Sequence, residues 1–252
     1  MKPVGIIGSG MIGSQVAKLA VAAGVNVIIS NSRGPETLRG LVDELGPLAR
    51  AGTLTGLIAE ADIIIVAVPL AAYKKLDAEA LAGKIMVDTM NYYPERDGEM
   101  PEISTAETAS SELVQKHLYK SRVVRALNNM DWVRLGSRAR PAGSSDRSAL
   151  PVAGNDETAK AEVITLIDKL GYDTADMGTL SESWRSEPTM PAYVLPYMGE
   201  ISSRFEALTE REWFMTAPGA PVSVLHLCEL LARAVRHDRM FGSTASLAGA
   251  SL

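Results

Sequence analysis

Val4-Gly-Ile-Ile-Gly-Ser-Gly-Met-Ile-Gly-Ser-Gln-Val-Ala17 is the stretch that decides the fold of this chain. Its apolar residues 4–7 predict a strand, and the pattern Gly8-x-Gly10-x-x-Gly13 follows at once. Residues 14–23 then carry apolar side chains at helical spacing up to Gly24, and a second apolar run covers residues 25–29. Strand, glycine turn, helix and strand in this order are typical of a Rossmann unit that binds a dinucleotide.

Each glycine of this turn has its own role in such a unit. Gly8 permits the tight turn, Gly10 lets the backbone approach a pyrophosphate, and Gly13 lets the helix pack close to the strand. The free N–H groups and the dipole at the start of a helix favour an anion. An ordinary structural turn is the alternative. We expect the loop to bind the cofactor through Gly8, Ser9, Gly10, Met11, Ile12 and Gly13.

The end of the second strand indicates which dinucleotide is bound. An enzyme that uses NAD usually has Asp or Glu there, which accepts hydrogen bonds from the ribose hydroxyls. This chain has Asn31-Ser32-Arg33-Gly34-Pro35-Glu36-Thr37 instead. Arg33 can pair with a 2′-phosphate, to which Ser32 and Thr37 can donate hydroxyl hydrogen bonds. The segment, Asn31 included, therefore predicts NADP. The alternative is a solvated arginine beside a simple helix cap.

The composition is that of an ordinary globular enzyme. The chain has 252 residues, of which 46% are apolar and 22% charged, and a net charge of −5 argues against a nucleic-acid binder. The single Cys228 and three histidines leave no disulfide and no zinc cluster to expect. There is no run of about eighteen apolar residues for a membrane span and no room for a signal peptide. We expect a cytoplasmic protein without a metal.

Apolar runs and helical patterns alternate along the first 178 residues. We expect further strands at residues 48–51, 63–68, 85–89, 122–127, 151–154 and 172–175, with helices between them that include 71–81 and 105–118. This alternation predicts an α/β fold with a Rossmann-type, doubly wound and mostly parallel sheet. Residues 1–178 form the expected NADP-binding domain.

Residues 179–252 show helical patterns only, and we expect them to form a C-terminal cap or dimerisation element with a disordered tail from Gly242 onwards. There are two apolar stripes at helical spacing, and one helix covering the sheet would need only one stripe. A homodimer through these helices is therefore predicted, with plain core packing as the alternative. The stripes are Val194, Met198, Ile201, Phe205 and Leu208, and Leu227, Leu230, Leu231, Ala234 and Val235.

Polar residues follow the strands at the edge where ligands of such sheets bind. The Val68-Pro69 junction ends one strand, Asn91-Tyr92-Tyr93 follows the next, and residues 128–131 follow the third. Amides there can hydrogen-bond a carboxamide or a substrate carbonyl. A small imine or carbonyl substrate would also need a proton donor. Loop packing is the alternative reading. The candidate catalytic residues are Tyr92, Asn128 and Asp131, with Tyr93 as a further donor.

Two other features are expected to be structural. Residues 134–148 form an irregular polar stretch with several arginines, which we interpret as a solvated loop, or else as a guide for an anionic substrate. Asp88 lies inside a predicted strand, where a buried carboxylate needs partners. We expect a hydrogen-bonding role for it rather than general-acid catalysis.

The motifs GSGMIG, NSRGPETL, AVP at 67–69, DTMNYYPERDG, RALNN and VAGNDE occur in this order. With them the chain resembles the NADP-binding oxidoreductases grouped with the deazaflavin (coenzyme F420)-dependent NADP reductases. Their nucleotide domain is similar to that of pyrroline-5-carboxylate reductase and the STEAP reductases. The resemblance covers about residues 1–180. It implies that Ser32 and Arg33 hold the 2′-phosphate and that Val68, Pro69, Ala126, Leu127 and Asn128 border the nicotinamide. Ala67 and Asn91 beside them are also expected to bind the cofactor.

The resemblance implies hydride transfer between NADPH and a deazaflavin- or flavin-type acceptor. Hydride transfer between stacked rings needs proximity and exclusion of water and little acid–base equipment, which fits the few histidines. The C-terminal part departs from the deazaflavin reductases because it continues for some seventy residues. A reductase of a small imine or carbonyl, or an NADPH sensor without turnover, therefore remains an alternative. No nucleic acid or membrane partner is expected.

Overall fold

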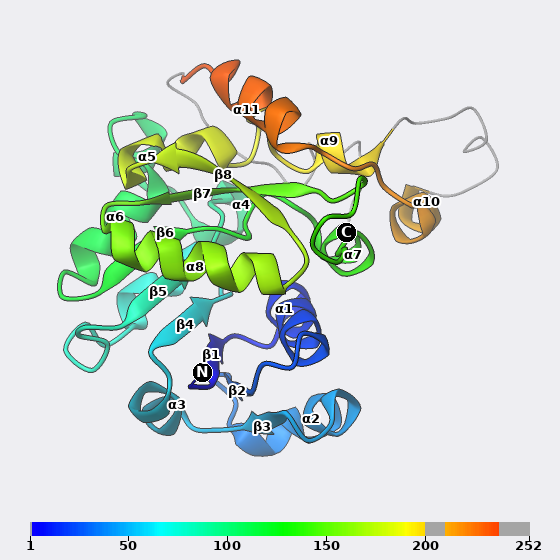
Figure 1. The fold of residues 1–252 in the computed structure, drawn as a ribbon. Helices are drawn as coiled ribbons and strands as arrows, with labels where there is room; N and C mark the ends of the chain where they lie inside the picture. The colour runs from blue at the N-terminus through cyan, green and yellow to red at the C-terminus, as the bar shows by residue number, and fades with distance from the viewer. Residues whose placement is uncertain (1, 200–209, 237–252) are drawn as a thin grey trace.

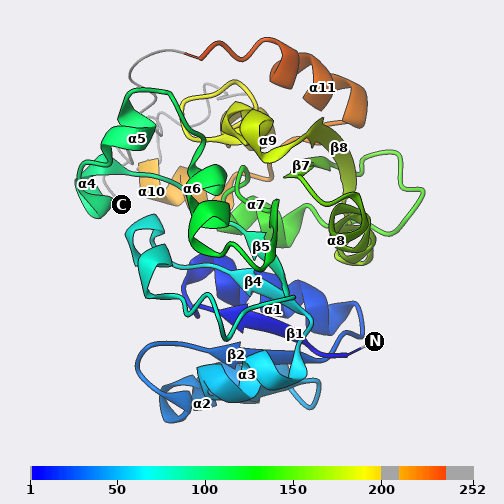
Figure 2. The ribbon, with the colours of Figure 1, turned by 90° about the vertical axis from the view of Figure 1, so that its left-hand side faces the viewer.

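The computed structural model describes residues 2–199 and 210–236. Its centre is one eight-stranded sheet in the order β3-β2-β1-β4-β5-β6-β7-β8, which runs from the bottom to the top of the molecule in Figures 1 and 2. All neighbouring strands pair in parallel except β6 and β7, which are antiparallel. The strands are β1 (Val4–Ile7), β2 (Val27–Ser30), β3 (Ala49–Ala51), β4 (Ile63–Val66), β5 (Ile85–Asp88), β6 (Arg122–Arg125), β7 (Ala149–Gly154) and β8 (Asp173–Gly178).

Helices cover both faces of the sheet, so the central strands β1, β2, β4 and β5 bury their side chains in two directions. Ile65 of β4 packs into one core cluster and its neighbour Ile64 into the other. This explains why β4 is apolar at every position, as expected of a strand covered on both sides. The first cluster includes residues of α1 (Met11–Ala22), α2 (Arg39–Leu45), α8 (Glu157–Lys169) and α11 (Val224–Ala232), and the second includes residues of α3 (Leu54–Glu60), η2 (Leu70–Lys75) and α6 (Ser110–His117). Figures 1 and 2 show α8 and α11 on opposite sides of β7 and β8.

The remaining elements are short helices and 3-10 turns in the connecting segments. They are η1 (Pro35–Leu38), α4 (Pro94–Asp97), α5 (Pro101–Ser104), α7 (Trp132–Ser137), η3 (Leu180–Ser186), α9 (Leu195–Met198) and α10 (Glu210–Thr216).

The predicted Rossmann-type, doubly wound and mostly parallel sheet is confirmed. The strand order reverses direction between β1 and β4, because the chain first builds outwards through β2 and β3 and then crosses back to β4. In open sheets of this kind, ligands bind in the crevice outside the carboxyl ends of the strands at such a point.

Two of the expected helices are shorter in the structure. Instead of a helix over residues 71–81, the chain makes the 3-10 turn η2 and then irregular turns, with Asp77 accepting from the backbone N–H groups of Glu79 and Ala80. The helix expected at 105–118 begins at Ser110. Asp77 offers the backbone a local hydrogen-bond partner, which competes with helix formation.

The prediction of a solvated loop at residues 134–148 is wrong. Arg134 lies on α7, and Arg134, Arg138 and Arg147 are buried. Each has a carboxylate partner: Arg134 pairs with Asp131 at 3.1 Å, and Arg147 with Asp168 and Asp173 at 2.8 and 2.9 Å. The partners of Arg147 lie more than twenty residues along the chain, so local sequence gave no sign of them.

The second apolar stripe covers the sheet of its own chain. Leu227, Leu230 and Leu231 of α11 are buried in the same cluster as β7, and Figure 1 shows α11 lying over β7 and β8. Val235 of the stripe is exposed. In the first stripe α9 spans four residues, while Ile201, Phe205, Leu208 and the tail lie outside the described residues. The domain boundary at residue 178 and the homodimer stay predictions.

Within residues 2–199 and 210–236, no helix has the length and apolar character that a bilayer crossing demands. The same ranges hold no cluster of three or more His, Cys, Asp or Glu suited to a metal ion.

Candidate cofactor-binding site

Two of the three motif glycines are required by the protein itself. Gly8 has a φ of +108°, and a Cβ atom there would lie 2.2 Å from the backbone oxygen of Ala67. A Cβ on Gly13 would lie 2.0 Å from the backbone oxygen of Gly8. These contacts bring α1, the turn and the end of β4 together, as the glycine pattern predicted.

Gly10 is different, because a Cβ atom there would meet nothing within 4 Å. The residue is the N-cap of α1, and no side chain accepts a capping hydrogen bond from the first-turn N–H groups. Ser14 donates its hydroxyl to the backbone oxygen of Ser9 at 3.1 Å and fixes the turn. The space left over Gly10 fits a pyrophosphate at a helix N-terminus.

Asn31 ties this turn to the segment that follows β2. Its Nδ2 donates to Ser9 Oγ at 3.2 Å and to Thr37 Oγ1 at 3.0 Å, and its Oδ1 accepts from the backbone N–H of Arg33 at 3.0 Å. Thr37 in turn donates to the backbone oxygen of Gly34 at 2.7 Å. Asn31 and Thr37 therefore shape the Ser32-Arg33 turn.

A cleft of about 460 Å³ opens along the carboxyl ends of β1, β2 and β4. It brings together nine of the residues predicted to bind the cofactor, whereas Thr37 does not line it. The nine are Gly8, Ser9, Gly10, Asn31, Ser32, Arg33, Ala67, Val68 and Pro69. Met11, Ile12 and Gly13 follow on the first turn of α1. The individual roles of these residues stay predictions.

The cleft also contains side chains that the sequence analysis missed. Lys75 comes from the end of η2 and faces the same hollow as Arg33. Across the described ranges, neither cation has a carboxylate within ion-pair distance, so both charges are available to a ligand. The sequence did not indicate Lys75, because one helix was expected over residues 71–81, whereas Lys75 ends the 3-10 turn η2. Leu54, Ala72 and Leu76 add apolar walls.

The carboxyl ends of β5 and β6 are held by a buried ion pair. Asp88 and Arg125 stand opposite each other in register, and their side chains pair at 3.2 Å. Asp88 also accepts from the hydroxyl of Ser111 at 2.7 Å and from the backbone N–H of Met90 at 2.9 Å. The structural role expected for Asp88 is confirmed, and Arg125 is the partner that the sequence analysis missed.

Arg125 extends this network to Asn91. Its Nη2 donates to Asn91 Oδ1 at 2.9 Å, while Asn91 Nδ2 donates to the backbone oxygen of Asn128 at 2.8 Å. The amide of Asn91 is thus engaged at both ends. Leu127 beside it has a φ of +58°, a backbone conformation that side chains other than glycine rarely adopt and that occurs often at functional sites. Ala126 and Leu127 are buried at this edge.

Asn128 and Asn129 connect the edge to the C-terminal part of the chain. Asn128 Nδ2 donates to the backbone oxygen of Ser186 at 2.7 Å, and Asn129 Nδ2 to that of Ala192 at 2.9 Å. The backbone N–H of Val194 donates to Asn129 O at 2.8 Å. Residues 186–194 therefore lie along the carboxyl ends of β5 and β6, where the acceptor side of the site is expected.

Two of the candidate catalytic residues have structural partners. Tyr92 is buried, and its hydroxyl donates to Gly98 O and accepts from the backbone N–H of Met100, both at 3.0 Å. Asp131 caps α7 by accepting from the N–H groups of Val133 and Arg134. These contacts offer no support for catalysis by Tyr92 or Asp131, so those roles stay predictions.

The neighbouring Tyr93 has a different environment. Its hydroxyl is in hydrogen-bond contact with that of Tyr193, and Asn91 Nδ2 lies 3.5 Å from the Tyr193 oxygen. Burial raises the pKa of Tyr93, against the hydrogen bond shared with Tyr193 and the charge of Arg96. Burial also raises the pKa of Tyr193 well above its ordinary value, and the adjacent Tyr93 adds to this. Both phenols are therefore neutral at physiological pH.

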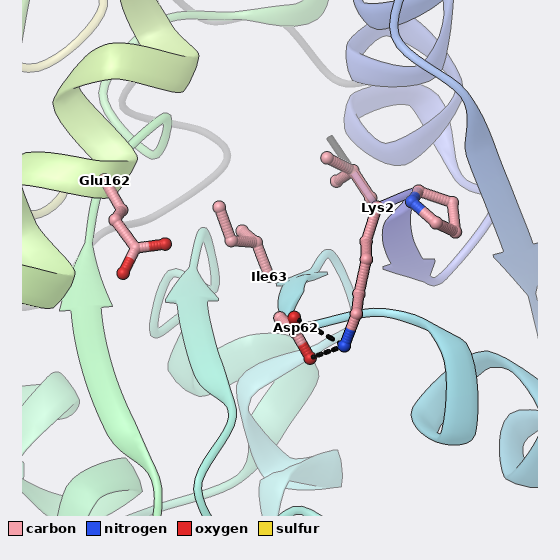
Figure 3. A pocket seen from close by; sticks show the side chains of 6 residues that line it. Lys2, Asp62, Ile63 and Glu162 are labelled. Atoms are coloured by element: carbon pink, nitrogen blue, oxygen red, sulfur yellow. Dashed lines mark hydrogen bonds and ion pairs between the residues drawn. The ribbon is translucent and has the colours of Figure 1, made fainter.

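A smaller hollow of about 170 Å³ lies at the opposite edge, where β1 and β4 begin. Figure 3 shows Lys2 reaching Asp62 there, with Glu162 of α8 on the other side. The hydrogen bond from Lys2 lowers the pKa of Asp62 against the effect of burial, and the two groups pair at 2.9 Å. This exposed ion pair lies at the amino ends of the strands, away from the edge that binds ligands in such sheets.

Known proteins share both the sequence and the fold. A profile of the family described as NADP oxidoreductase, coenzyme F420-dependent, matches residues 3–92. The hypothetical protein SMa0349 from Sinorhizobium meliloti is 30% identical, and its structure matches with a TM-score of 0.69 over 77% of this chain and 94% of its own. A structure from Arthrobacter sp. FB24, described as a proposed F420-dependent NADP-reductase, is 28% identical, with a TM-score of 0.61 over 73% of this chain and 87% of that one.

A curated relative is similar over a shorter part. The YjhV protein of Escherichia coli strain K12 is 40% identical over 53 residues, which make up 21% of this chain and 39% of YjhV. The profile match covers the glycine turn, the Ser32-Arg33 segment and the ends of β4 and β5, and the likeness to SMa0349 extends over most of both chains. This chain therefore belongs to the family of coenzyme F420-dependent NADP oxidoreductases and is an NADP-dependent oxidoreductase.

Proposed function

We propose that this protein transfers a hydride between NADP(H) and a deazaflavin- or flavin-type acceptor. The observation that carries the proposal is the cleft itself, where the open space over Gly10 and the unbalanced charge of Arg33 lie in one hollow. A pyrophosphate and a 2′-phosphate need these two features. The family and the 28% identical Arthrobacter structure support a deazaflavin as the acceptor.

Different residues of the cleft bind different parts of the cofactor. The first-turn N–H groups of α1 bind the pyrophosphate, and Ser32 and Arg33 bind the 2′-phosphate, with Lys75 as a second cation. Leu54, Ala72 and Leu76 contact the adenine ring. NADPH supplies a hydride from its nicotinamide ring when bound. Residues 186–194 cover the carboxyl ends of β5 and β6 and exclude water there.

The second candidate is reduction of a small imine or carbonyl compound. The paired hydroxyls of Tyr93 and Tyr193 favour it, because this chemistry needs a proton donor beside the accepting nitrogen or oxygen. An NADPH-binding sensor without turnover is the remaining alternative, and it predicts binding alone.

The test is a fluorescence titration of the purified protein with NADPH and, separately, with NADH. Oxidised deazaflavin, a flavin, a cyclic imine and a small ketone are then added one at a time to the NADPH-loaded protein, and NADPH absorbance is followed.

Tight binding of NADPH with rapid oxidation by the deazaflavin or the flavin is the expected result. Oxidation by the imine or ketone alone would move the assignment to the second candidate. Binding without oxidation by any acceptor would support the sensor and refute both reactions. Binding of NADH but not NADPH would refute the role of Ser32 and Arg33.

A further inference from the structure

We propose that Tyr193, together with Tyr93, donates the proton that accompanies hydride transfer. This inference rests on the proposed function, because either reduction consumes one hydride and one proton. It assigns a catalytic role to a residue of the C-terminal part, to which the sequence analysis gave no site residue.

The first argument is the number of protons in the pair. Tyr93 and Tyr193 carry one hydroxyl proton each, and the contact between their oxygens uses only one. Asn91 Nδ2 approaches the Tyr193 oxygen as a donor, at 3.5 Å, and accepts nothing from it. Among the residues that the structure describes, no acceptor takes the second proton. One phenol O–H is therefore left to donate to a bound acceptor.

The other tyrosines close to this edge differ in this respect. The hydroxyl of Tyr92 donates to Gly98 O, and that of Tyr197 donates to Ala149 O at 2.8 Å while accepting from Asn129. Their protons are committed to backbone oxygens. Among these tyrosines, only the Tyr93–Tyr193 pair has a hydroxyl proton for which the described residues provide no acceptor.

The second argument is where the pair lies. Tyr93 follows β5 directly after Asn91, and Tyr193 lies on the segment that Asn128 and Asn129 hold against the end of β6. In sheets of this topology the reacting end of a ligand lies outside these strand ends. The pair is thus connected through Asn91 to the residues expected to border the nicotinamide.

The third argument is backbone strain immediately after Tyr193. Val194 has a φ of +49° and a ψ of −58°, and the N–H of Leu195 donates to Tyr193 O at 2.6 Å. This is a γ-turn of the positive-φ kind, which is rare and strained, and a β-branched residue fits it poorly. The surrounding structure must stabilise it, as the bond from Val194 N to Asn129 O does. The turn fixes the course of the backbone at Tyr193.

The charges around the pair suit a proton donor. Tyr93 contacts Tyr193 and Arg96, whose guanidinium lies 4.9 Å from the Tyr93 ring centroid. The charge of Arg125 on β6 lowers the pKa of Tyr193, and the charge of Asp131 before α7 raises it. Burial keeps both phenols protonated. Once a proton has left, Arg125 and Arg96 stabilise the phenolate, because an adjacent positive charge favours the ionised form of a phenol.

The chemical balance is simple. NADPH gives up a hydride and becomes NADP⁺, and the acceptor takes the hydride at carbon. The O–H bond of Tyr193 breaks as an N–H or O–H bond forms on the acceptor, at a ring nitrogen of a deazaflavin, an imine nitrogen or a carbonyl oxygen. Tyr93 returns a proton to Tyr193 and recovers its own from solvent.

The experiment compares Tyr193→Phe and Tyr93→Phe with the wild type and with Tyr119→Phe. Tyr119 is an exposed tyrosine that hydrogen-bonds Glu79 beyond the helix α6, so its variant controls for loss of a phenol elsewhere. NADPH affinity, circular dichroism and the single-turnover rate are measured with the acceptor that the wild type reduces, from neutral to alkaline pH and in heavy water.

The expected result is a loss of about 100-fold or more in the rate for Tyr193→Phe, the low end of what a general acid contributes. NADPH affinity and the circular dichroism spectrum should be unchanged. The wild-type rate should stay level from neutral pH to pH 10, because burial keeps the pKa of both phenols above that value, and it should show a solvent isotope effect. The isotope effect should vanish in Tyr193→Phe and persist in Tyr119→Phe, while Tyr93→Phe should slow the reaction less.

A Tyr193→Phe rate within about twofold of the wild type, with the same pH profile, would overturn the proposal while leaving the proposed function intact, since a positioned acid contributes far more than this. If Tyr193→Phe does not fold, the wild type decides the matter together with Tyr93→Phe. The proposal then stands if the solvent isotope effect is present in the wild type and altered in Tyr93→Phe, and it fails if that effect is absent from the wild type. If the wild type reduces none of the tested acceptors with NADPH, the proposed function is refuted, and the proposed proton donor with it.

Discussion

Arg33 carries a charge that no carboxylate of the described chain balances, and it lines the same cleft as the open space over Gly10. We predict that Arg33→Ala weakens NADPH binding by about 10- to 100-fold, because a hydrogen bond to a charged group contributes about 1.5–3 kcal/mol. NADH, which lacks the 2′-phosphate, should bind as before. Fluorescence titrations with both nucleotides check this, and an equal loss for NADH would show that Arg33 acts elsewhere.

Gly10 and Gly13 belong to the same motif but have different surroundings, and this separates binding from folding. Gly10→Ala places a methyl group in open space, so we predict normal thermal stability with strongly reduced NADPH binding. Gly13→Ala places one against the backbone of Gly8 and should lower stability as well, typically by about 1–3 kcal/mol for an overpacked site. Thermal unfolding and NADPH titration of both variants test this. Undiminished binding by Gly10→Ala would contradict the pyrophosphate site.

At the scale of single elements, the cap of α7 combines two functions in one side chain. Asp131 accepts from two N–H groups at the start of the helix and also pairs with the buried Arg134. Asp131→Asn keeps an efficient cap but leaves the buried arginine without a counter-charge. We predict a loss of unfolding free energy of about 3–5 kcal/mol, the usual cost of breaking a buried ion pair.

Asp156→Asn is the matched control for this prediction, because Asp156 caps α8 through the N–H of Ala159 without an ion pair. It should be close to neutral in urea denaturation. If Asp131→Asn lost activity at temperatures where it remains fully folded, the predicted catalytic role of Asp131 would gain support instead.

For the whole molecule, the tyrosines link stability to alkaline pH. All seven have a pKa raised above the ordinary value of 10.0, mostly because of burial. The unfolded chain therefore loses its phenol protons at lower pH than the folded chain. The resulting stability is fully present below pH 10 and is lost as the pH rises further.

We predict that the urea midpoint falls steadily above pH 10 and that folded tyrosinate absorbance rises later than in the urea-unfolded chain. Titrations of the folded and the unfolded protein measure both. Coincident titration curves would contradict the burial of these side chains.

The homodimer through the C-terminal helices remains a prediction. One of the two stripes that suggested it packs on the sheet of its own chain, while Leu225 of α11 and Val235 after the helix are exposed. Light scattering should give the mass of a dimer at micromolar concentration, and a monomeric mass there would refute the prediction.

The sequence predicted the sheet well because its signals are local. The glycine turn, the apolar run of β4 and the Ser32-Arg33 segment each lie within a few residues, and the structure brings them to one cleft. Lys75 was missed because η2 replaces the expected helix, and Arg125 because its partner lies on another strand. The Tyr93–Tyr193 contact joins residues a hundred positions apart, a distance at which no pattern in a single sequence indicates proximity.

The predicted domain boundary at residue 178 is a poor crossover point for chimaeras of this protein and its relatives, because hydrogen bonds join the two sides. Glu187 binds the first N–H and the hydroxyl of Ser110 at the start of α6, and Asn128 and Asn129 hold residues 186–192. A chimaera that inherits its C-terminal half alone would receive one side of each of these bonds. Acceptor preference is therefore inherited as a set that includes the loops after β5 and β6, and crossovers that keep this set together are the ones that should yield folded hybrids.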